Sequence, residues 1–107
     1  MWIRSAFWTG TPKSGSAEQF QAAIDDMLVP ALRVLPGVRD ASALWPRRFE
    51  DKPPQIACQI LVEFENREDV DRMLASPERH ALRTKVVEIV GLFDGAISHI
   101  DYEVGST

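Results

Sequence analysis

Residues 55–65 read Gln-Ile-Ala-Cys-Gln-Ile-Leu-Val-Glu-Phe-Glu, and this stretch decides the fold. One set of alternate positions is wholly apolar and consists of Ile56, Cys58, Ile60, Val62 and Phe64. Successive side chains of a strand point to opposite sides, so a period of two indicates a strand with one buried face. The stretch therefore predicts a strand that packs these side chains against helices.

Three other segments show weaker strand patterns. They span residues 2–8, 38–45 and 96–104, and turn-forming residues lie between them and the helical segments. The order of elements is then strand, helix, strand, strand, helix, strand. Right-handed crossovers would place both helical segments on one face of a four-stranded antiparallel sheet, with the strands in the spatial order four, one, three, two. We expect one ferredoxin-like split βαβ domain of the α+β class over residues 1–107.

The first helical segment begins at Ser16. Ser16 and Gln19 have the spacing of a capping box, in which each side chain bonds a backbone N–H at the other position. Apolar residues then recur on one side of the segment, which is typical of a helix packed on a core. Pro30 lacks an N–H, so a kink or break is expected near residues 28–29.

The second helical segment is expected to be divided in two. Asn66 is a favourable N-cap for a short helix, and Ser76 followed by proline restarts another. That second part is predicted to run to about Phe93, where Asp94 and Gly95 would stop it.

Composition excludes several classes of function. The chain has 107 residues, of which 45% are hydrophobic and 26% charged, with neither a membrane span nor a secretory signal in sight. A net charge of −4 removes the attraction on which most nucleic-acid binding depends. One cysteine and two distant histidines offer no internal disulfide and no metal-ligand spacing. We expect a cytoplasmic protein with no metal or other cofactor, no nucleic-acid partner and no membrane attachment.

The sheet face opposite the helices is expected to be apolar. Its candidate residues are Trp2, Trp8, Ala41, Ala43, Trp45, Ala57 and Leu61. A monomer of this size would expose that surface to water, so we expect a homodimer in which two sheets pack face to face.

A site is predicted between this uncovered face and the helix that covers its end, and four side chains contribute to it: Arg4, Trp8, Gln59 and His99. The prediction assumes that the neighbouring apolar residues Ile3, Phe7, Ile100, Tyr102 and Val104 point toward the helices. His99 is the candidate catalytic residue, a proton shuttle that titrates near neutral pH. For substrate binding, Arg4 suits a carboxylate or enolate, Gln59 a carbonyl group and Trp8 an apolar ring. In the alternative reading, His99 only forms a hydrogen bond where two subunits meet.

Two other reactive side chains are expected to have no chemical role. His80 lies away from the apolar side of its helix and is predicted to be solvated. Cys58 alternates with core residues, where a small hydrophobic side chain is the usual function of cysteine.

Three further motifs are Val29-Pro30 with Leu35-Pro36-Gly37-Val38, the stretch Leu74-Ala75-Ser76-Pro77-Glu78, and Phe93-Asp94-Gly95. In their order and spacing they resemble the EthD-like branch of the dimeric α+β barrel superfamily. The resemblance implies a homodimer whose sheets form a barrel around a small-molecule cavity. It also implies action on aromatic, polyketide-like or lactone compounds, often without metal or organic cofactor. Similar relatives commonly carry a histidine just before the Val-Pro pair, where this chain has Leu28.

Two functions remain open at this point. The first is a small cofactor-independent enzyme, a lyase, isomerase, cyclase or oxygenase, that acts on a hydrophobic aromatic or polyketide-like carbonyl compound. The second is a non-catalytic ligand-binding or ancillary dimeric module of a catabolic or biosynthetic pathway, which the missing histidine favours. A haem-binding protein is a third and more distant alternative. The sequence leaves open whether the protein is an enzyme.

Overall fold

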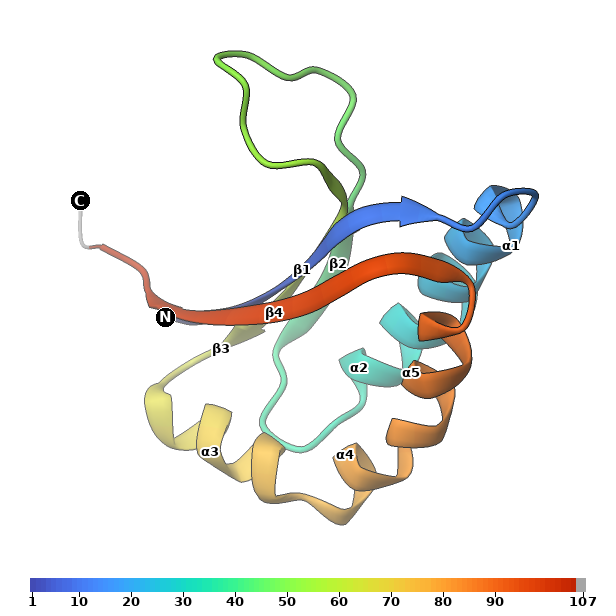
Figure 1. Ribbon diagram of the computed structural model, residues 1–107. Coiled ribbons are helices and arrows are strands. Elements are labelled where there is room, and N and C mark those ends of the chain that lie inside the picture. Colours follow the sequence, from blue (N-terminus) through green and yellow to red (C-terminus); the bar gives the residue numbers. More distant parts are fainter. Residues whose placement is uncertain (106–107) are drawn as a thin grey trace.

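The computed structural model describes residues 1–105 of the chain. Its centre is an antiparallel sheet of four strands in the order β2-β3-β1-β4, and the helices all lie on one face of it (Figure 1). The strands are β1 (Trp2–Pro12), β2 (Asp40–Leu44), β3 (Ile56–Phe64) and β4 (Phe93–Glu103). The helices are α1 (Ala17–Ala22), the π-helix η1 (Ala23–Leu28), α2 (Val29–Arg33), α3 (Arg67–Ala75), α4 (Pro77–Ala81) and α5 (Arg83–Val90). The predicted ferredoxin-like α+β fold is confirmed, including its strand order.

The predicted buried face of β3 is also confirmed. Cys58, Ile60, Val62 and Phe64 are all at most 6% exposed, because the helices cover this side of the strand. Phe20 from α1 joins the same buried cluster. Burial of this apolar surface is the main favourable contribution to folding, and it places the helices on that side.

The two faces of β1 and β4 are the reverse of those expected. Arg4 lies opposite the core residue Val62, and Trp8 is on the same side of β1, which is the helix-covered side. His99 lies opposite Ala6, which also faces the helices. Alternation does not decide the orientation of β1 and β4, because large apolar side chains occupy both of their faces.

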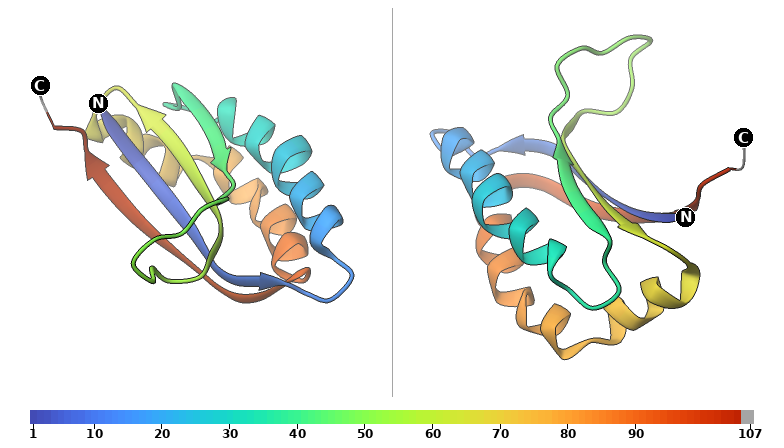
Figure 2. Two further views of the ribbon diagram at one scale, coloured as in Figure 1. Left: turned by 90° about the horizontal axis from the view of Figure 1, so that it is seen from above. Right: turned by 180° about the vertical axis from the view of Figure 1, so that it is seen from behind.

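The uncovered face of the sheet accordingly carries other residues than those predicted. Trp2, Trp8, Ala41, Ala43 and Trp45 belong to the helix-covered side, and of the predicted set only Ala57 and Leu61 remain. Trp45, for example, donates from its indole Nε1 to Asp25 at 3.0 Å. The uncovered face, seen in the left view of Figure 2, instead carries Ile3, Phe7, Leu44, Leu61, Ile100 and Tyr102.

Two of the three predicted helix caps are confirmed. The side-chain oxygen of Asn66 accepts from the N–H of Asp69 at 2.9 Å, and Ser76 Oγ accepts from the N–H of Arg79 at 3.2 Å. The capping box at Ser16 is wrong, since the Ser16 side chain makes no capping hydrogen bond. Its φ of −109° and ψ of 3° differ from the extended conformation that directs a cap side chain toward the helix.

Pro30 changes the winding of the first helical segment and does not break it. The segment continues from α1 through η1 to α2, and the N–H of Val29 donates to the C=O of Ile24, five residues earlier. The wider π turn lies just before Pro30, where an α-helix would leave a carbonyl without its donor.

β1 and β4 pair further along the chain than their patterns predict. The pairing includes Gly10 with Gly95 and reaches Pro12 with Phe93. Gly95 therefore lies inside a strand and does not stop a helix, because α5 already ends at Val90. The ribbon of these two strands curves over the helix layer and ends beside α1 and α5 (Figure 1).

Candidate functional site

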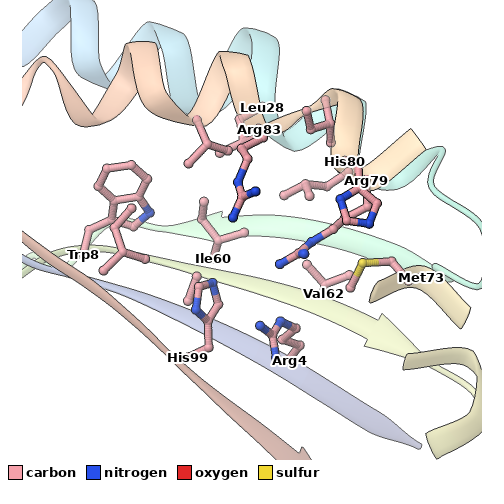
Figure 3. A pocket seen from close by; sticks show the side chains of 15 residues that line it. Arg4, Trp8, Leu28, Ile60, Val62, Met73, Arg79, His80, Arg83 and His99 are labelled. Atoms are coloured by element: carbon pink, nitrogen blue, oxygen red, sulfur yellow. The ribbon is translucent and has the colours of Figure 1, made fainter. Parts of the chain in front are cut away.

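A cavity of about 260 Å³ lies between the helix-covered face of the sheet and the helices (Figure 3). β1, β3 and β4 form its floor, and η1, α2, α4 and α5 cover it. Its apolar lining includes Trp8, Leu28, Ile60, Val62, Met73 and Ile97. The candidate site is thus on the opposite side of the sheet from the one predicted, because it lies within the subunit and beneath the helices.

Trp8 forms one end of the cavity. Its side chain is 2% exposed and meets the rings of Phe20 and Phe93 edge-on, with centroids 5.3 and 5.4 Å away. The indole Nε1 is buried and has no hydrogen-bond partner within residues 1–105, and Figure 3 shows it on the cavity side of the ring. A buried N–H without an acceptor is costly, so this end of the cavity offers a donor to an oxygen of a bound molecule.

His99 stands midway along the floor of the cavity. It lies opposite Ala6 in the β1–β4 pairing, two positions along β1 from Arg4. Partial burial lowers the pKa of His99, and the positive charges of Arg4 and Arg79 lower it further. Asp101 acts in the opposite direction and does not overcome them. A histidine with a lowered pKa is neutral at pH 7 and is ready to accept a proton.

Arg4 forms an ion pair with Asp101 of the neighbouring strand β4. Its Nη1 donates to both carboxylate oxygens of Asp101, at 2.9 and 3.1 Å. The two side chains are 17% and 34% exposed, so the ion pair is only partly screened by water. The charge of Arg4 is largely compensated within the protein, and the pair fixes the position of its guanidinium.

Three basic side chains from α4 and α5 also line the cavity. They are Arg79, His80 and Arg83, and Figure 3 shows both guanidinium groups directed toward the sheet. His80 is exposed, as predicted, although it lies at the cavity. The sequence analysis missed both arginines. Their spacing of four residues, which puts two side chains on the same side of a helix, is the signal that would have found them.

Gln59 is not part of the cavity. Its Nε2 donates to the hydroxyl of Ser5 at 2.8 Å on the uncovered face of the sheet. The orientation predicted for Gln59 is therefore correct, whereas Arg4, Trp8 and His99 face the other way. The structure brings three of the four predicted site residues together and separates Gln59 from them by the thickness of the sheet.

Cys58 is fully buried in the core, as predicted. Burial, together with the negative charge of Asp25, raises the pKa of Cys58 to about 12. The thiol is therefore protonated at neutral pH and is not a thiolate nucleophile.

Residues 1–105 contain neither a candidate metal-ion cluster nor a candidate membrane-spanning helix. In this part of the chain, no group of three or more His, Cys, Asp or Glu side chains is placed to hold a metal ion. No helix within the same residues is both long and apolar enough to span a bilayer.

Several solved structures share the fold of this protein over almost the whole chain. An EthD family protein from Bacillus halodurans is 13% identical, with a TM-score of 0.77 over 98% of this chain and 100% of that one. A dimeric ferredoxin-like protein of unknown function from Jannaschia sp. CCS1 is 20% identical, with a TM-score of 0.68 over 97% and 100%. The chain has the ferredoxin-like α+β fold. A cofactor-independent oxygenase from Streptomyces nogalater has it too, at 17% identity and a TM-score of 0.62 over 99% and 93%.

The likeness to an EthD family protein agrees, at the level of the fold, with the motifs that resemble that family in the sequence. No family model and no curated protein matches the sequence. Identities of 13 to 20% establish the fold alone, so the function has to be argued from the cavity.

Proposed function

We propose that the protein is a cofactor-independent enzyme that binds a hydrophobic carbonyl compound in the cavity and moves a proton on it with His99. The observation that carries this proposal is the meeting of apolar walls, the unpartnered N–H of Trp8 and a neutral imidazole in one cavity. A protein cavity of about 150 Å³ holds benzene. At about 260 Å³, this one has room for a compound of one or two rings.

In the proposed reaction, the substrate carbonyl oxygen accepts a hydrogen bond from Nε1 of Trp8. His99 takes a proton from the carbon next to the carbonyl, and the electron pair of that C–H bond forms an enolate. The donor at Trp8 stabilises the enolate oxygen more than the neutral carbonyl, which lowers the barrier. Return of the proton from His99 to another carbon of the substrate completes an isomerisation. In a ring closure, the enolate carbon bonds to the carbon of a second carbonyl group in the substrate, the C=O π bond of that group opens, and its oxygen takes the proton from His99. The cofactor-independent oxygenase of the same fold supports chemistry without a cofactor.

A non-catalytic binding module is the second candidate, and Leu28 favours it. Leu28 lines the cavity and precedes the Val-Pro pair. The resemblance to the EthD-like family implies a histidine at this position. If that histidine is required for catalysis, this cavity binds its ligand without changing it.

We also propose that the protein is a homodimer in which the uncovered sheet faces pack together. Ile100 and Tyr102 on this face are 47% and 41% exposed, and Ile3, Phe7 and Leu61 extend the apolar surface beside them. Contiguous apolar surface of this kind favours association. The dimeric ferredoxin-like protein of the same fold supports a dimeric state.

The test of the enzymatic proposal uses 2-tetralone, a ketone with two fused rings whose protons beside the carbonyl are acidic. Nuclear magnetic resonance in D₂O follows the replacement of these protons by deuterium. We expect the wild-type protein to accelerate the replacement and His99→Gln to slow it roughly 100-fold or more while 2-tetralone still binds. Ser98→Ala is the matched control, because Ser98 is the neighbouring residue of β4 and faces away from the cavity.

The outcomes separate the two candidate functions. Saturable binding of 2-tetralone without deuterium incorporation would favour the binding module over the enzyme. Equal rates in the wild-type protein and His99→Gln would remove His99 from the mechanism. Absence of binding would contradict both candidates.

A further inference from the structure

We propose that the ligand of the cavity is an amphipathic anion, whose carboxylate or similar planar oxyanion binds to the guanidinium groups of Arg79 and Arg83. The inference rests on the proposed function only in that the cavity is taken to be a ligand site. It adds the charge of the ligand, the residues that bind that charge and the direction in which the ligand lies.

The charge of the cavity lining is the first observation. All of its ionisable side chains are basic: Arg4, Arg79, His80, Arg83 and His99. The whole chain carries a net charge of −4, so the positive cavity lining does not reflect the average composition. Clefts lined by one sign of charge concentrate ligands of the opposite sign.

The three arginines of the cavity lining differ in their ion pairing. Arg4 is paired with Asp101 at 2.9 Å. Within residues 1–105, neither Arg79 nor Arg83 has a carboxylate within ion-pair distance, although both guanidinium groups point toward the sheet (Figure 3). Two guanidinium groups from adjacent turns of α4 and α5 are therefore available to an external anion. A guanidinium matches a carboxylate with two parallel hydrogen bonds.

The walls of the cavity decide what kind of anion fits. Leu28, Leu32, Ile60, Val86 and Ile97 surround the basic groups with apolar surface. A small hydrated anion would lose water there and gain no contact with these side chains, whereas an apolar ring system gains from its burial. The combination favours an anion that carries a hydrophobic body.

Trp8 gives the ligand a direction. Its unpartnered Nε1 lies at one end of the cavity, and Arg4 lies four residues away on the same face of β1. At about 3.3 Å per residue these two positions are about 13 Å apart, and His99 stands opposite the midpoint of this span. Figure 3 shows Arg79 on the Arg4 side of His99, away from Trp8, and its positive charge there lowers the pKa of His99. A neutral oxygen of the ligand then faces Trp8, and the charged group lies at the arginine end.

The experiment compares 2-naphthoate with 2-naphthamide by isothermal titration calorimetry. The two compounds have the same rings and a carbonyl oxygen, but only naphthoate is charged at neutral pH. We expect naphthoate to bind roughly tenfold more tightly, since hydrogen bonds to charged groups are the stronger ones. Its advantage should shrink when the ionic strength rises from about 0.02 M to about 0.2 M.

Two variants locate the charge that is recognised. Arg79→Gln and Arg83→Gln should each weaken naphthoate binding roughly tenfold and leave naphthamide binding unchanged. Arg67→Gln is the matched control, because Arg67 is an exposed arginine of α3 outside the cavity lining. In proton nuclear magnetic resonance spectra, the indole N–H signal of Trp8 can be assigned by its loss in Trp8→Phe. This signal should shift when either compound is added.

The outcomes distinguish a failure of the anion inference from a failure of the proposed function. Equal affinity for both compounds in all variants would overturn the anion inference and leave the proposed function standing. Discrimination between them by Arg79 and Arg83, with no deuterium exchange of 2-tetralone, would support the anion inference and count against the enzyme. Binding of neither compound would overturn the inference together with the ligand site itself.

Discussion

His99 lies in β4 among charges of both signs. Asp101 favours its protonated form, whereas partial burial and the guanidinium groups of Arg4 and Arg79 disfavour it. The net effect is a pKa below the ordinary value of 6.5, so the folded protein holds a neutral imidazole where a free histidine would be partly charged. The burial of His99 and the charges around it therefore favour the neutral form that a general base requires.

This environment predicts how stability depends on pH. Just below pH 6.5, His99 is protonated in the unfolded chain and still neutral in the folded one, so the unfolded state binds more protons. Acidification through this window therefore favours unfolding, and the loss ends once the pH is below the lowered pKa. We expect His99→Gln to lose less stability than the wild-type protein between about pH 7 and about pH 5. Urea unfolding midpoints measured across this pH range test the expectation. Midpoints that fall equally with pH in the two proteins would contradict it.

At the scale of elements, the close pairing of β1 with β4 requires glycine at one position of each strand. Gly10 and Gly95 lie opposite each other, with φ of 131° and 156°. A Cβ on Gly95 would collide with the carbonyl oxygen of Thr9, and one on Gly10 would collide with the carbonyl oxygen of Asp94. The two backbones approach this closely only because neither residue has a side chain.

Gly95→Ala is expected to lower the free energy of unfolding by about 2 to 4 kcal/mol, because it combines a collision with the backbone and an unfavourable φ. Gly105→Ala is the control, since a Cβ at Gly105 would meet nothing within 4 Å. Urea denaturation of the two variants gives the comparison. A Gly95→Ala midpoint equal to that of Gly105→Ala would mean that β4 shifts to accommodate the methyl group.

At the scale of the whole molecule, the two faces of the sheet differ in what covers them. The helix-covered face holds the cavity, and the uncovered face leaves apolar side chains such as Ile100 and Tyr102 in water. Assembly through the uncovered face would hide these side chains without closing the cavity, because the helices lie on the other side (Figures 1 and 2).

The proposed homodimer predicts a mass near twice the 12.0 kDa of one chain in light scattering. Ile100→Glu should convert the protein to a monomer, because a charge would have to be buried without a partner in the interface. Val34→Glu changes a residue that is 82% exposed and follows α2 on the helix side, so it should leave the dimer intact. A mass of one chain for the wild-type protein would contradict the interface.

Several features of this protein follow from its sequence alone. β3 has apolar residues on one face and Gln59 and Glu63 on the other, so its buried side is determined by local pattern. Asn66 and Ser76 cap helices through bonds that reach only three residues along the chain. The order of elements and the handedness of their connections then determine the strand order, because few other arrangements bury the apolar faces.

The tertiary structure decided the rest. β1 and β4 carry large apolar side chains on both faces, so which face is covered depends on how Trp8 fits against Phe20 and Phe93. The reversed faces moved the candidate site beneath the helices and left Gln59 outside it. The cavity is a space between elements that are distant in sequence, so the residues that line it are determined by how those elements pack. Local alternation describes one strand at a time, whereas the choice between two apolar faces is made by contacts across the whole fold.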